Sequence, residues 1–338
     1  MDELFDILKL LCNESGISGD EKSVREKIIA LIKDFCEVKT DNFGNIIAFK
    51  KGKKSSEKKV MCDAHLDEVG FIITDITEDG FLKFAPVGGI DVSVMLARRV
   101  TVGNNIKGTV GIKPIHLSDT EELKSAPKQS ALYIDIGADS KEDALKYVSI
   151  GDSAVMDSEY EDNGRFIKSK ALDDRIGCAV LAFMLRQEAE YDYYVSFSVQ
   201  EEVGLRGAKT SAYSIDPDIA IVIDGTTASD IAGTPETSEV CNLGRGAVVS
   251  FMDRATLYDK ELYNLALNSN INCQPKRAVA GGNNAGSIHL SKNGVRTIAV
   301  SNPCRYIHSA ASVAQKSDII SVYELVKYIL KSAASGKV

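Results

Sequence analysis

Residues 60–68 read VMCDAHLDE, an apolar run that ends in the polar side chains of His65, Asp67 and Glu68. Such a run is typical of a buried strand. The same pattern recurs at residues 195–202, VSFSVQEE, and at residues 219–226, IAIVIDGT. In open α/β sheets, ligands bind outside the carboxyl ends of the strands. The three segments together therefore predict one functional site at that edge of a sheet.

Helical and strand patterns alternate around these segments. Apolar residues at helical spacing predict a helix over residues 20–36, and further helices are expected over 174–190 and 318–332. Another strand is expected at 297–301. The alternation predicts an α/β fold, with a mixed, largely parallel sheet flanked by helices on both faces.

The pattern changes between residues 70 and 165, where short strand-like runs are separated by turn signals such as EDG at 78–80. A chain of 338 residues also exceeds the length at which one hydrophobic core stops growing. We therefore expect a catalytic domain of residues 1–69 and 166–338. Residues 70–165 are expected to form an inserted, small β-rich domain.

Composition narrows the class of protein. The net charge of -8 is a poor match for a phosphate backbone, so we expect no nucleic-acid partner. No apolar run approaches the roughly 18 residues of a spanning helix, and the N-terminus lacks the basic segment of a secretory signal. We expect no membrane partner and a cytoplasmic enzyme. The seven cysteines are widely spaced, which favours buried thiols over disulfides or metal ligands.

Two further segments carry the same kinds of side chain: LDDR at 172–175, expected at the start of a helix, and RYIHS at 305–309. Carboxylates gathered in one place repel each other unless cations neutralise them. Histidine and carboxylate ligands without cysteine suit Zn²⁺, Co²⁺ or Mn²⁺. A dinuclear site with one bridging carboxylate would leave room for a water or hydroxide. The pattern indicates a hydrolase.

Each feature also has a structural alternative. Asp173 could cap a helix, Asp224 could belong to a turn, and His308 could be a buried core histidine. Four motifs in order argue against that explanation: AHLDEVGF at 64–71, ALDDR at 171–175, QEEVGLRGA at 200–208, and RYIHS at 305–309. Together they resemble the tetrahedral aminopeptidases, the glutamyl aminopeptidase-like dinuclear metallopeptidases, from about residue 4 to residue 330. Some relatives of that family carry an endoglucanase label.

The resemblance implies two divalent metal ions per subunit, zinc or cobalt, with manganese as an alternative. His65 and Asp224 would bind the first ion, and Glu202 and His308 the second. Asp173 would bridge the two ions.

The resemblance also assigns roles beside the ligands. Glu201 would be the general base. Asp67 would support catalysis by accepting a hydrogen bond from the other ring N–H of His65, which fixes the tautomer of that histidine. Asp174 would follow Asp173 across a strained peptide bond that can be cis.

The implied function is removal of amino-terminal residues from short peptides. The inserted domain, residues 70–165, would form dimers, and the dimers of this homo-oligomer would assemble into a tetrahedral dodecamer. A deacylase or carboxypeptidase on the same dinuclear scaffold is the main alternative. A glucanase is a weaker one, because paired carboxylates also serve sugar hydrolysis.

Specificity stays open at the level of sequence. Arg254 and Arg305 are the basic residues nearest the motifs. If either lines the pocket, an acidic amino-terminal residue would be favoured through charge-assisted hydrogen bonds. If both pair with structural carboxylates such as Asp253 or Asp259, an apolar pocket would favour Leu or Met.

One departure from the family concerns the residues after Gly281 and Gly282. This chain has Asn283 and Asn284 where relatives commonly carry a Thr-Asp pair. The missing acid would affect recognition of the substrate amine or a supporting hydrogen bond.

Overall fold

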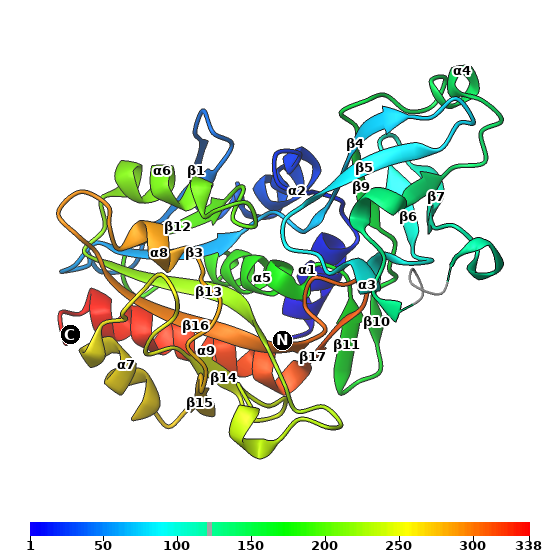
Figure 1. The fold of residues 1–338 in the computed structure, drawn as a ribbon. Coiled ribbons are helices and arrows are strands. Elements are labelled where there is room, and N and C mark those ends of the chain that lie inside the picture. The colour runs from blue at the N-terminus through cyan, green and yellow to red at the C-terminus, as the bar shows by residue number, and fades with distance from the viewer. Residues whose placement is uncertain (120–123) are drawn as a thin grey trace.

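The computed structural model describes residues 1–119 and 124–338 (Figure 1). Within these residues an eleven-stranded mixed sheet forms the centre of the larger body. Its main path runs in the order β1 (Glu37–Thr40), β2 (Ile46–Lys50), β12 (Tyr193–Ser198), β3 (Val60–His65), β13 (Ile219–Thr227), β16 (Arg296–Arg305), β17 (Ser312–Gln315), β11 (Phe166–Ser169) and β10 (Glu161–Asp162). Two short strands, β14 (Ala247–Val249) and β15 (Cys273–Pro275), extend from β16.

The four central strands, β12, β3, β13 and β16, are parallel, and the other strands of the main path pair antiparallel, whereas β14 and β15 pair parallel. The α/β fold with a mixed sheet is therefore confirmed. Because the central strands are parallel, their carboxyl ends share one edge of the sheet. His65, Ser198 and Asp224 are brought to that edge by β3, β12 and β13.

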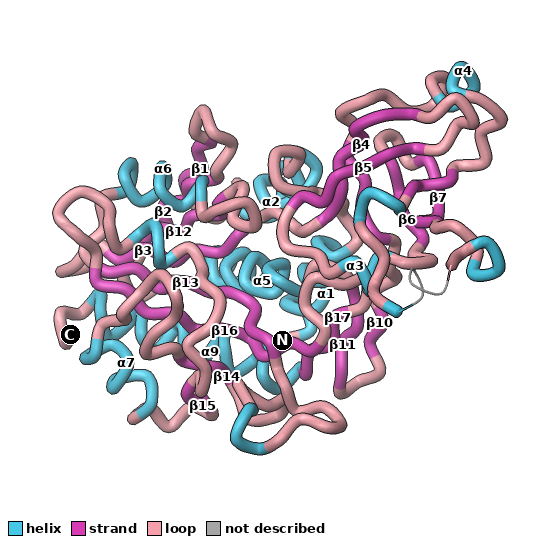
Figure 2. The backbone as a smooth tube through the Cα atoms, in the orientation of Figure 1, coloured by secondary structure: helices cyan, strands magenta, loops and turns pink. Residues whose placement is uncertain are grey.

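Helices cover both faces of this sheet, as Figures 1 and 2 show. The larger core lies under α1 (Asp2–Cys12), α2 (Lys22–Ile32), α5 (Leu172–Arg186), α7 (Lys260–Leu267) and α9 (Lys316–Ala334). A smaller core lies under α6 (Arg206–Ile215) and α8 (Ala285–Ile288). Along β3, Cys62 and Ala64 enter the first core and Met61 enters the second. Burial on both faces explains why these strands are continuously apolar.

A separate closed barrel stands beside this body (Figure 1). Its strands are β4 (Gly70–Ile76), β5 (Leu82–Val87), β6 (Arg99–Val102), β7 (Ile106–Gly111), β8 (Tyr133–Asp135) and β9 (Ser153–Met156), with the short helices α3 (Val92–Met95) and α4 (Lys141–Ala144). It has its own apolar core, which includes Phe71, Leu82 and Ile134. The strand β10, which lies inside the expected inserted region, pairs with β11 in the main sheet instead.

The domain boundaries at 69/70 and 165/166 stay predictions. In the described part of the chain, no helix is both long and apolar enough to cross a membrane.

Candidate active site

The first half of the site lies where β3, β13 and α5 meet. His65 is the last residue of β3, and its side chain is 2% exposed. Its Nε2 lies 3.3 Å from Oδ1 of Asp173 and 3.6 Å from Oδ1 of Asp224. Asp173 precedes the regular turns of α5, since its backbone is not helical. One imidazole and two carboxylates therefore face a common point.

The second half lies on the other side of Asp173. Nε2 of His308 is 3.5 Å from Oδ2 of Asp173 and 3.1 Å from Oε1 of Glu202. The two oxygens of Asp173 thus face different histidines. Two ligands of one tetrahedral zinc ion, each bound at about 2.0 to 2.1 Å, lie about 3.3 to 3.4 Å apart. The separations in both halves fit donors that share an ion.

All five predicted ligands are brought together, although the groups whose donor atoms all lie within 4.8 Å of one another divide them differently. One such group is His65, Asp173 and Glu202, and the other is His65, Asp174 and Asp224. Asp174 follows a cis peptide bond, and its carboxylate accepts hydrogen bonds from the backbone N–H groups of His65 (3.3 Å) and Gly177 (2.9 Å). Both oxygens of Asp174 thus accept backbone N–H groups, whereas Asp173 and Asp224 each accept the N–H of Gly225 at one oxygen, so Asp174 stays outside the proposed ligand set.

The charges of the cluster shift one another's pKa. Although burial favours the neutral acid, hydrogen bonds from His308 and His65 hold the pKa of Asp173 well below its ordinary value. Burial, reinforced by the charge of Asp173, raises the pKa of Asp224 to about 7. Although burial favours the neutral ring, hydrogen bonds to Asp173 and Glu202 raise the pKa of His308 to about 11. The clustered carboxylates thus favour protons and protonated histidines beside them, and a divalent cation would supply the same positive charge.

Glu201 lies next to the ligand cluster without joining it. The residue is 9% exposed and lines the same cavity as Asp173, Glu202 and Asp224. Burial holds the pKa of its carboxyl well above the ordinary value, and the neighbouring acids act in the same direction. A buried carboxyl with a raised pKa suits proton transfer.

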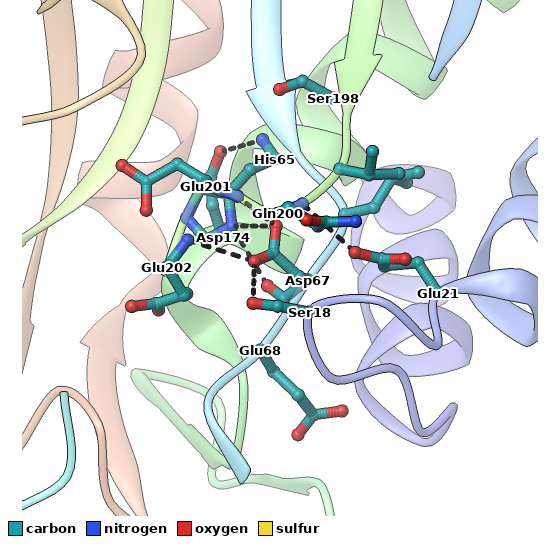
Figure 3. Close-up of polar contacts among 12 residues, drawn as sticks. Ser18, Glu21, His65, Asp67, Glu68, Asp174, Ser198, Gln200, Glu201 and Glu202 are labelled. Atoms are coloured by element: carbon teal, nitrogen blue, oxygen red, sulfur yellow. Dashed lines mark hydrogen bonds and ion pairs between the residues drawn. The ribbon is translucent and has the colours of Figure 1, made fainter. Parts of the chain in front are cut away.

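Asp67 supports both halves of the site (Figure 3). Its Oδ1 and Oδ2 accept hydrogen bonds from the backbone N–H groups of Glu201 and Glu202, and Oδ2 also accepts one from Oγ of Ser18, at 2.6 Å. Nδ1 of His65 lies 3.0 Å from the backbone carbonyl oxygen of Asp67 and 3.5 Å from Oδ1. The nearest acceptor for the ring proton is therefore the carbonyl rather than the expected carboxylate.

The two asparagines are buried and support the loop beside the site. Asn284 donates to Oδ2 of Asp63 and to Oγ of Ser198, each at 2.8 Å. Asn283 donates to the hydroxyl of Tyr258 at 2.9 Å. Asn284 thus has a supporting hydrogen-bond role.

Neither arginine considered for specificity lines the cavity at the ligands. Arg305 forms a two-pronged ion pair with Asp230, at 2.9 and 2.7 Å. Arg254 is exposed and contributes its backbone N–H to the carbonyl of Gly281. Among the described residues, the lysine or arginine that does line the cavity is Lys276, which sequence reasoning missed.

The chain matches the sequence profile of the M42 glutamyl aminopeptidase family over residues 44–325. It belongs to that family. A candidate aminopeptidase of Acetivibrio thermocellus is 41% identical over 96% of this chain and 98% of its own length. A lysyl aminopeptidase of Pyrococcus furiosus and a glutamyl aminopeptidase of Lactococcus lactis are each 30% identical, over 97% and 99% of this chain and 96% and 98% of their own lengths.

Solved structures agree with this assignment. An aminopeptidase from Desulfurococcus kamchatkensis superimposes with a TM-score of 0.93 at 34% identity, covering 98% of this chain and 96% of its own. A TET1 peptidase of Pyrococcus horikoshii, which can assemble into a tetrahedron or a large octahedral shell, gives 0.84 at 33%, covering 96% and 98%. A Thermotoga maritima protein named endoglucanase gives 0.79 at 34%, covering 98% and 97%.

This M42 protein is a peptide hydrolase, as its family and aminopeptidase relatives show. M42 peptidases depend on metal ions, and the described residues include two groups that could hold one.

Proposed function

We propose that this M42 protein is a dinuclear metallo-aminopeptidase that removes amino-terminal residues from short peptides. The observation that carries the proposal is the position of Asp173, whose two oxygens lie 3.3 and 3.5 Å from the imidazoles of His65 and His308. One carboxylate facing two separate donor sets suits a bridging ligand. His65 and Asp224 would complete one set, and Glu202 and His308 the other.

When bound, two divalent ions, zinc or cobalt with manganese as an alternative, would lower the pKa of a shared water toward 7 and polarise the scissile carbonyl. The carboxylate of Glu201 would accept a proton from the attacking water and pass it to the leaving amine. Asp67 positions Glu201 by accepting its backbone N–H. Burial of Glu201 favours its protonated form, which helps it to hold the proton between the two steps.

The test begins with metal analysis of the purified protein after dialysis, and with assays on a panel of amino-acid p-nitroanilides in added Zn²⁺ or Co²⁺. Peptides with free and acetylated amino termini separate an aminopeptidase from a deacylase or carboxypeptidase. A cello-oligosaccharide tests the glucanase name of one similar structure. We expect hydrolysis only of substrates with a free amino terminus. Sugar hydrolysis needs two carboxylates and no histidine ligands, so a glucanase would leave His65 and His308 without a role.

Two adjacent carboxylates give a matched pair of variants. Glu201→Gln should lower turnover by about 10² to 10⁴ while the metal content stays unchanged, because it removes only the base. Glu202→Gln should lower the metal content itself. Full turnover by Glu201→Gln would contradict the proposed base.

We also propose a cytoplasmic homo-oligomer in which dimers assemble into a tetrahedral dodecamer through residues 70–165. Support comes from the shells of the Pyrococcus horikoshii relative and from the separate barrel of this chain. Light scattering coupled to size exclusion measures the mass. A monomer at micromolar concentration would contradict the assembly.

A further inference from the structure

The cavity beside the ligand cluster is lined by side chains of opposite charge. It has a volume of about 320 Å³. Its acidic groups come from Asp173, Glu201, Glu202 and Asp224, and the proposed ligand His308 lines it beside Glu202. Other lining residues are neutral, with hydroxyl, apolar or backbone surfaces: Gly225, Thr226, Thr227, Val240, Ala280, Gly281, Gly282, Asn283, Ser301 and Ile307. Lys276 is the one lysine or arginine among the residues described as lining it.

Lys276 is held in place without using its charge. It directly follows the short strand β15, and its backbone N–H donates to the carbonyl of Val249 at 2.9 Å. Its Nζ donates to the carbonyl of Ala280, also at 2.9 Å. Over residues 1–119 and 124–338, no carboxylate forms an ion pair with this ammonium group within 4.0 Å. Of its three N–H donors, two are left for another acceptor.

Two other basic side chains of this region, those of Arg305 and Arg277, have carboxylate partners. Arg305 is paired with Asp230. Arg277, the neighbour of Lys276, lies 3.8 Å from Glu239 and does not line the cavity. Lys276 therefore differs from both arginines, because it combines a place in the cavity with an unpaired charge.

A peptide whose amino-terminal residue is acidic matches both kinds of charge in this cavity. Its α-amino group carries positive charge and is attracted by the carboxylates around Asp173, whereas its side-chain carboxylate is attracted by Lys276. The apolar surfaces of Val240 and Ile307 can contact the methylene groups between them. A lysine side chain in the same position would meet a like charge, which disfavours it.

We propose that Lys276 determines the specificity of this site and selects peptides with an amino-terminal Glu or Asp. The inference rests on the proposed aminopeptidase function and adds the substrate class to it. The interaction is a charge-assisted hydrogen bond between the ammonium group and the side-chain carboxylate of the substrate.

The experiment compares kcat/KM on Glu, Asp, Leu, Ala and Lys p-nitroanilides. The wild-type protein should prefer Glu or Asp. Lys276→Met keeps most of the aliphatic stem and removes the charge, so the ratio of Glu to Leu should fall by about 10- to 100-fold. The value of kcat/KM on Leu should fall less than that on Glu, because Leu offers no carboxylate to the ammonium group.

Two control variants separate charge from structure. Lys276→Arg retains the positive charge and should retain a preference for acidic residues. Arg277→Met removes the adjacent positive charge, outside the cavity, and should leave the ratio unchanged. A preference for Leu in the wild-type protein that Lys276→Met does not alter would overturn the inference.

A binding measurement keeps the inference separate from catalysis. Calorimetric titration of the metal-loaded protein with L-glutamate and L-leucine should show tighter binding of glutamate, and Lys276→Met should abolish the difference. If no amide substrate is hydrolysed but this difference is present, the proposed function fails and the role of Lys276 stands. Equal binding of the two amino acids by the wild-type protein would overturn that role.

Discussion

The carboxylate of Asp67 holds the backbone of Glu201, whose N–H lies 3.0 Å from Oδ1. Its second oxygen lies 3.1 Å from the N–H of Glu202, so one side chain fixes two consecutive residues (Figure 3). Glu21 adds a third contact, because its Oε1 accepts the N–H of Gln200 at 3.1 Å. The turn that carries the proposed base and a proposed ligand is thus held by two buried carboxylates.

Asp67→Asn should lower turnover by about 10- to 100-fold, which is the usual effect of removing a residue that hydrogen-bonds to a metal ligand. An asparagine has one acceptor oxygen, so one of the two backbone N–H groups loses its partner. The kcat and the metal content of the variant measure this effect. Ser18→Ala is the matched control, since it removes only the hydroxyl bond to Oδ2 and should have a smaller effect. Unchanged kcat in Asp67→Asn would show that the contact does not position the base.

Asp173→Ala should lose both metal ions, because its two oxygens face both halves of the site. Asp224→Ala affects only the half that contains His65, so it should retain more metal. Elemental analysis after dialysis distinguishes the two variants. Equal metal content in Asp173→Ala and the wild-type protein would rule out a bridging role.

The structure brings together the residues that the sequence singled out, because strand ends carry local patterns. His65 ends one apolar strand, Asp224 lies near the end of another and Glu201 comes shortly after a third. Parallel strands bring their carboxyl ends to one edge. Lys276 escaped prediction, since it follows a strand of only three residues and no motif surrounds it. The sequence also could not show whether Arg305 lines the pocket, because that depends on its side-chain direction, and the side chain pairs with Asp230.

Helix α1 could have been predicted from its local sequence, whereas strand β10 could not. The helix α1 was not among the expected helices, although Leu4, Leu8 and Leu11 repeat at helical spacing and are fully buried. That signal was present in the sequence. By contrast, β10 has two residues and is defined by pairing with β11, which no short segment can indicate by itself.

A buried ion cluster beside the site should be important for stability. Glu68 accepts from Lys170 at 2.7 Å and from Arg175 at 3.2 Å, and all three residues are at most 6% exposed. Glu68→Gln leaves two buried cations without a counter-charge, which costs about 3 to 5 kcal/mol of unfolding free energy. Urea unfolding measures this loss. Lys22→Met, which removes an exposed pair with Glu26, is the control and should change little. A similar, small change in both variants would contradict the prediction.

The pH dependence of stability should reveal the pair between Asp259 and Arg296. Hydrogen bonds from Arg296, at 2.8 and 3.0 Å, hold the pKa of Asp259 below its ordinary value. A carboxyl whose pKa is lowered on folding contributes stability above its unfolded pKa of about 3.9, and this stability is lost as the pH falls through the folded value. The wild-type protein should therefore exceed Asp259→Asn in stability equally at pH 7 and pH 5. The difference should shrink below about pH 4.

A second substitution at the same position separates charge from helix capping. Oδ1 of Asp259 also accepts the backbone N–H groups of Glu261 and Leu262, each at 3.0 Å, at the start of α7. Asparagine keeps an oxygen for this cap, whereas Asp259→Ala removes it and should cost about 1 kcal/mol more. That extra cost should not vary with pH, because it involves no titrating group. Urea midpoints at pH 7, 5 and 3.5 measure both effects, and a gap between wild type and Asp259→Asn that stays constant to pH 3.5 would refute the assigned charge contribution.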